Sequence, residues 1–145
     1  MIMLVTGVFW GTWFTLTRSL SDFSPGEFIH IGQTIIANVA IPMGILMPAT
    51  LFFLLWSMWI TYNKSRPAFY LYAMSFLLMV VTLIITVAVE VPIDNQIKTW
   101  TVNTIPENWK SLRQTWDEFH TARTFTSIAS FAFYVSGMLK RIVWT

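Results

Sequence analysis

The chain has 145 residues and a net charge of +2; 55% of the residues are hydrophobic and only 11% are charged. Soluble domains carry about 25% charged residues, so this composition indicates a membrane protein whose first partner is a lipid bilayer. The absence of cysteine excludes disulfides and thiolate chemistry. No basic stripe lies outside the flanks of the apolar segments, so we expect no nucleic-acid partner.

Four segments contain no Asp, Glu, Lys or Arg: 1–17, 28–63, 67–89 and 124–139. A helix needs about 20 apolar residues to cross the hydrocarbon core of a bilayer. The two middle segments satisfy this length, and the two outer ones need polar neighbours at the membrane edge. We therefore predict an all-α, integral membrane four-helix bundle, in one domain over residues 1–145. The expected spans are about 2–20, 28–62, 67–91 and 117–139, with an outer loop and helical extension over 92–116.

The first span follows no basic residues and ends at no small-residue cleavage site, so we interpret it as a span and not as a signal peptide. It also lacks the embedded carboxylate of small four-span multidrug transporters, which argues against that class.

The second span has helix-start signals, with Ser24 as the N-cap and Pro25 at the first position. Pro42 and Pro48 are expected to bend it.

The turn after the second span and the C-terminus both carry cations: Lys64, Arg66, Lys140 and Arg141. An even number of spans places these two regions on one side of the membrane, and the positive-inside rule makes that side cytoplasmic. We expect both termini in the cytoplasm and the protein in a plasma or inner membrane. The outer connection also carries cations, which runs against this orientation.

Residues 92–103 are predicted to form a loop, followed by a helix start at Thr104 to Glu107. From there Trp109, Trp116 and Arg123 recur at helical spacing. We expect this helix to continue unbroken into the fourth span.

Polar side chains of three spans converge at one height. Counting about 1.5 Å per residue from the cationic end, Glu90, His120 and Asn38 all arrive near the outer edge of the hydrocarbon. Ionisable groups at membrane depth usually pair with each other. We predict an ion pair between Arg123 and Glu90, with Asp94 as the substitute partner. The same residues are also compatible with a purely structural ion pair, or with side chains that extend to the interface.

A metal site is a further interpretation. Two histidines and a carboxylate can hold iron(II), and His30, His120 and Glu90 reach a similar depth. The chain lacks the short ligand spacings of known sites, however, so we assign no metal and no other cofactor.

Two motifs point to a family. The third span ends in V-P-I-D-N at residues 91–95, and W-x-x-x-H-x-x-R-T at 116–124 opens the fourth span. Together with segments 7–14 and 28–42, these motifs resemble those of the anthrone oxygenase family. In that family Asn is common at the position of His120.

The resemblance implies a four-helix membrane protein that acts with O2 on a flat, phenolic polycyclic compound, either without a cofactor or with a metal. It implies His120 as general base and Arg123, paired with Glu90, as stabiliser of an enolate oxyanion. The side chains implied to bind substrate are the amides and indoles Gln33, Asn38, Asn95, Trp109 and Trp116.

The alternative function is a non-catalytic or accessory subunit that contacts other membrane chains or a second copy of itself. An enzyme requires a cavity beside these polar groups, whereas a structural subunit fills that space with side chains.

Overall fold

The computed structural model describes residues 1–143, and in this part of the chain it contains helices and no strand. The elements are α1 (Ile2–Thr15), the 3-10 helix η1 (Thr17–Asp22), α2 (Pro25–Thr61), α3 (Arg66–Ile85), the π-helical turn η2 (Thr86–Glu90), α4 (Val91–Ile97) and α5 (Trp109–Val143). The all-α prediction is confirmed.

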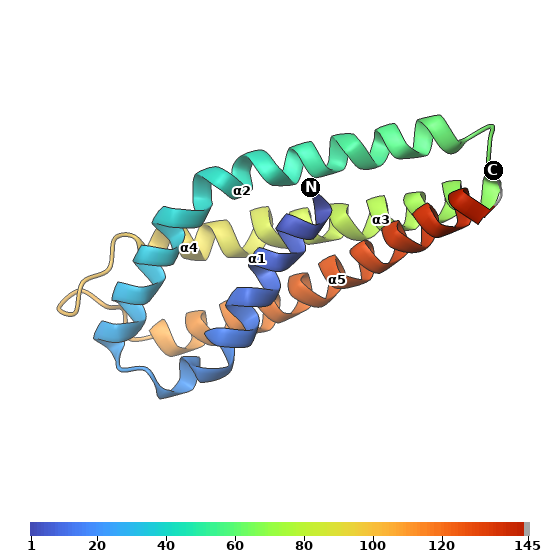
Figure 1. The fold of residues 1–145 in the computed structure, drawn as a ribbon. Helices are drawn as coiled ribbons and strands as arrows, with labels where there is room; N and C mark the ends of the chain where they lie inside the picture. The colour runs from blue at the N-terminus through green and yellow to red at the C-terminus, as the bar shows by residue number, and fades with distance from the viewer. Residues whose placement is uncertain (144–145) are drawn as a thin grey trace.

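The long helices α2, α3 and α5 run along the molecule, and α1 crosses them obliquely (Figure 1). The turn between α2 and α3 and the C-terminal end of α5 lie at one end of the bundle, and η1 and the loop before α5 lie at the other. The cations Lys64 and Arg66 therefore share one end with Lys140 and Arg141. The N-terminus lies partway along the bundle.

The predicted start of α2 is confirmed. The Ser24 hydroxyl accepts a hydrogen bond from the Glu27 amide, and the Glu27 carboxylate accepts one from the Ser24 amide at 2.9 Å, which together form a capping box. Pro42 and Pro48 lie inside this helix. Figure 1 shows that α2 changes direction partway along its length, as expected where a proline removes a helical hydrogen bond.

The predicted loop over 92–103 is wrong at its start, because the chain remains helical through Ile97. Pro92 has no amide hydrogen and would clash with the carbonyl four residues earlier in a regular α-helix. The chain accommodates it with a π turn, in which the Val91 amide bonds to the Thr86 carbonyl. The helix over the last span begins at Trp109, just after the expected start, because Pro106 forms a turn with Trp109.

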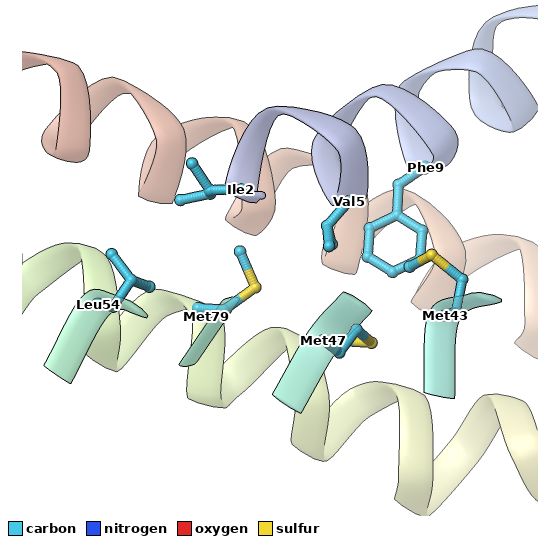
Figure 2. Close-up of a cluster of buried hydrophobic side chains, with 7 residues drawn as sticks. All are labelled: Ile2, Val5, Phe9, Met43, Met47, Leu54 and Met79. Atoms are coloured by element: carbon cyan, nitrogen blue, oxygen red, sulfur yellow. The ribbon is translucent and has the colours of Figure 1, made fainter. Parts of the chain in front are cut away.

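An apolar cluster holds α1 against α2 and α3. Its buried side chains are Ile2, Val5, Phe9, Met43, Met47, Leu54 and Met79. Figure 2 shows these side chains in the space between the three helices. Burial of this kind stabilises by about 25 cal/mol per Å² of apolar surface.

The most extensive helix contact, between α3 and α5, uses small and hydroxyl side chains. Ser130 donates to the Ser75 carbonyl at 2.7 Å, and their hydroxyls are 3.1 Å apart. Gly137 packs under Tyr72, where an added Cβ would lie 2.8 Å from the ring. Small residues of this kind let membrane helices approach closely.

The outer surface of the bundle is apolar and its interior is partly polar. Ile41 is 75% exposed and Trp59 71% exposed, whereas Ser75, Thr82 and Ser127 are fully buried. Two helical stretches, Pro25–Thr61 and Arg66–Ile97, are long and apolar enough to cross a membrane. This distribution suits a protein that is surrounded by lipid, where polar side chains gain by facing one another.

Candidate functional site

A cavity of about 480 Å³ lies between α1, α2, α5 and the segment from α3 to α4. Ligand pockets usually measure about 300–1,000 Å³ and combine apolar walls with a few polar groups. Here Met43, Met47 and Leu83 are among the apolar wall residues. Apart from Thr12 of α1, the charged and polar lining comes from the later part of the chain and comprises Thr86, Asp94, Asn95, Lys98, Trp116, His120 and Arg123.

Arg123 makes several polar contacts at the wall of this cavity. Its Nη2 lies 2.9 Å from Glu90 Oε2, so the predicted ion pair forms. Its Nε and Nη2 donate to His120 Nδ1 at 3.1 and 2.8 Å, and Nη1 donates to the Thr86 hydroxyl at 3.4 Å. The guanidinium also lies over the ring of Phe9, with Cζ 4.6 Å from the centroid.

These contacts fix the orientation of the guanidinium. A guanidinium has five N–H groups, and the contacts above leave one N–H of Nη1 without a partner among residues 1–143. Arg123 is 8% exposed and lines the cavity. It therefore places a fixed positive charge at the wall of an apolar space, where it can stabilise a developing oxyanion.

The contacts of His120 determine which of its nitrogens carries a proton. A guanidinium can only donate hydrogen bonds, so Nδ1 must be the acceptor, and in the neutral ring Nε2 then carries the hydrogen. Nε2 is buried and makes no hydrogen bond in the described chain. The ring is stacked on Trp116 at 4.8 Å between centroids and makes a T-shaped contact with Phe9 at 6.3 Å. Neither nitrogen of this tautomer offers a free lone pair.

Glu90 is fully buried and does not line the cavity. The π turn ends at this residue and so sets the direction in which its carboxylate leaves the helix; π turns are frequent at functional sites. Its Oε2 pairs with Arg123, and its Oε1 accepts no hydrogen bond from residues 1–143. Glu90 thus balances the charge of Arg123 from behind the cavity wall.

The polar end of the cavity is formed by α4 and α5. Trp116 Nε1 donates to Asp94 Oδ1 at 3.1 Å, which ties the two helices together. One turn further, Lys98 Nζ donates to Asn95 Oδ1 at 3.0 Å. This end therefore presents a carboxylate, an amide and an ammonium group beside the indole of Trp116.

A known protein family matches this chain. The family model described as anthrone oxygenase matches residues 33–133, which is more than half of the chain and includes every element around the polar end of the cavity. The chain belongs to the anthrone oxygenase family. No curated protein and no solved structure matches it.

The structure brings together five of the eight predicted site residues in this family member. Arg123, His120, Trp116 and Asn95 line the cavity, and Glu90 lies directly behind Arg123.

Three predicted substrate-binding residues lie elsewhere. The Gln33 amide donates to the carbonyls of Ile97 and Trp100, at 3.0 and 2.9 Å, and so holds the end of α4. Asn38 is exposed and outside the cavity lining. Trp109 packs against Phe28 at 5.9 Å in a separate apolar cluster.

The iron(II) interpretation required His30 beside His120 and Glu90. His30 is exposed on α2 and does not line the cavity. Among the described residues, no group of three or more His, Asp or Glu side chains is arranged to hold a metal ion.

Sequence reasoning did not identify Phe9, Thr86 or Lys98 as site residues. Phe9 lies on α1 in an apolar run and nothing in the sequence marks it. Thr86 lies four residues before Glu90, on the same side of a regular helix, and this spacing was a usable signal. Lys98 follows Asp94 by one helical turn, and this spacing was a second usable signal.

Proposed function

We propose that this protein is a membrane oxidoreductase that uses O2 to oxidise a flat, phenolic polycyclic compound of the anthrone type. The observation that carries the proposal is the apolar cavity of about 480 Å³ with Arg123 fixed in its wall. Family membership supplies the reaction class. An apolar polycycle enters such a space directly from the bilayer, where it is most soluble.

The chemistry suits a site that holds a cation and a base. An anthrone carries a methylene group whose proton is acidic, because the resulting carbanion is delocalised onto the carbonyl oxygen. The carbanion reacts with O2, and the overall change converts CH2 and O2 into C=O and H2O. In this scheme the protein binds the ring system, stabilises the enolate oxygen and accepts a proton.

The roles of three predicted catalytic residues follow from their contacts. Arg123 directs its remaining N–H at the enolate oxygen, and the apolar walls strengthen that interaction by excluding water. His120 and Glu90 act as positioning residues that hold the guanidinium. The earlier expectation of His120 as general base is not favoured, since Nδ1 already accepts from Arg123.

For the membrane arrangement, we propose that the end with Lys64, Arg66, Lys140 and Arg141 faces the cytoplasm of a plasma or inner membrane. This places the polar end of the cavity near the outer interface. The positive-inside rule and the shared location of these cations support the proposal.

The alternative is a non-catalytic subunit of a larger membrane assembly, in which the ion pair between Arg123 and Glu90 is purely architectural. A buried ion pair of this kind is compatible with that function. A structural role does not need a large cavity beside the pair, so the cavity favours the enzyme.

The test is purification in mild detergent, followed by O2 uptake and quinone formation with an anthrone, metal analysis, and mass spectrometry of co-purifying chains. We expect uptake by the wild type, a loss of about 100-fold or more in Arg123→Met, and no change in Lys110→Ala, a matched cation outside the cavity. No uptake together with stoichiometric partner chains would establish the subunit function instead.

A further inference from the structure

The proposed oxidation needs a group that removes the methylene proton, and we propose that Asp94 is this group. The inference rests on the proposed function and goes beyond it, because it assigns the proton acceptor to a residue outside the expected catalytic set.

The other candidate bases are already engaged. His120 accepts from Arg123 through Nδ1, which leaves its Nε2 protonated. Glu90 is fully buried behind Arg123 and outside the cavity lining. Lys98 and Arg123 are the cations of the lining. Among the described lining residues, Asp94 is the only carboxylate.

The geometry of Asp94 suits a proton acceptor. Its Oδ1 accepts from the Trp116 indole at 3.1 Å, which fixes the plane of the carboxylate. Within residues 1–143 this is the one hydrogen bond of the carboxylate, and Asp94 lines the cavity, so we assign proton acceptance to the other oxygen, Oδ2. Asp94 lies within the short helix α4, held to α2 through Gln33, and is therefore on a rigid element.

Trp116 connects the two halves of the site. Its ring stacks on His120, which holds Arg123, and its N–H holds Asp94. The oxyanion-binding group and the proton acceptor thus share one supporting side chain at the polar end of one cavity. A substrate whose carbonyl oxygen contacts Arg123 has its ring system in the same space as Asp94.

The proton and electron changes balance. Asp94 takes the first methylene proton, and the electron pair of the C–H bond passes to the enolate. The carbanion carbon forms a C–O bond to O2, and the peroxide anion takes the proton back from Asp94. Asp94 then removes the second proton, the carbonyl forms as the O–O bond breaks, and the departing hydroxide leaves as water after protonation by Asp94. The carbon loses four electrons and O2 gains four.

The experiment separates proton removal from the reaction with O2. Under anaerobic conditions in D2O, the wild-type protein in detergent is mixed with an anthrone, and deuterium incorporation at the methylene is followed by mass spectrometry. A general base typically contributes about 10²–10⁴-fold, so we expect exchange to fall by at least about 100-fold in Asp94→Asn. Asp94→Glu keeps the carboxylate and should retain a measurable part of the exchange.

The matched control is Glu118→Gln, because Glu118 is an exposed carboxylate on α5 outside the cavity and should not alter exchange. Substrate binding, measured by quenching of tryptophan fluorescence, should persist in Asp94→Asn and shows that the variant is folded. Wild-type-like exchange in Asp94→Asn, with O2 uptake intact, would refute Asp94 as the base and leave the proposed function standing. Neither exchange nor uptake in the wild type would refute both.

Discussion

The ion pair between Arg123 and Glu90 gives the sharpest test of how the site is held. In Glu90→Gln the negative charge disappears while the shape of the side chain is kept. Removing one partner of a buried pair typically costs about 3–5 kcal/mol. Glu90 is 0% exposed and Arg123 8% exposed, but His120, Thr86 and the Phe9 ring still contact the guanidinium. We therefore expect the free energy of unfolding to fall by the lower end of this range, about 3 kcal/mol.

The assay is thermal unfolding in one detergent, followed by circular dichroism. For a chain of this size, 1 kcal/mol corresponds to about 2–4 °C in Tm, so Glu90→Gln should lower Tm by about 6–12 °C. The double variant Glu90→Gln with Arg123→Met removes the uncompensated charge and should recover most of this loss. A Tm within about 2 °C of wild type, or a double variant less stable than Glu90→Gln alone, would refute the view that the buried charges need each other.

Two further substitutions test the packing and the helix start, each by Tm in the same detergent. Gly137→Ala should destabilise the protein by about 1–3 kcal/mol, because the new Cβ would lie 2.8 Å from the Tyr72 ring. The control is Gly7→Ala, which has no atom within 4 Å of the new Cβ and should be neutral or slightly stabilising. Equal effects at both sites would contradict the α3–α5 packing. Ser24→Ala should cost about 1 kcal/mol, because the Glu27 amide loses its capping acceptor; an unchanged Tm would mean that α2 does not depend on its cap.

The ion pair could be predicted from the sequence because charges at membrane depth need partners, and few are available. Glu90 and Arg123 are the charges nearest to the ends of two apolar runs, so their pairing follows from the cost of leaving either alone. The capping residues of α2 were equally predictable, since a cap depends only on local sequence.

The role of Gln33 could not be predicted, because it depends on where the chain returns after α4. Its amide donates to the carbonyls of Ile97 and Trp100 and is therefore engaged within the protein, where the resemblance implied a contact with substrate. Phe9 is similar: its contact with Arg123 depends on the oblique path of α1, which apolar composition does not determine.

The π turn at Thr86–Glu90 also changes how sequences of this family should be aligned and compared. A π turn contains one residue more than an α turn, so each side chain after it is rotated by about 100° relative to a regular helix counted from Arg66. Pro92 lies just after this extra residue, where the π turn removes the need for its missing amide hydrogen. A relative with the same number of residues here but a regular α-helix would place the residue at position 94 on another face of the bundle, whereas a relative with one residue fewer and a regular α-helix would keep it on this face. The length of the segment between Ile85 and Pro92 is therefore as informative about a shared reaction as the identity of the site residues.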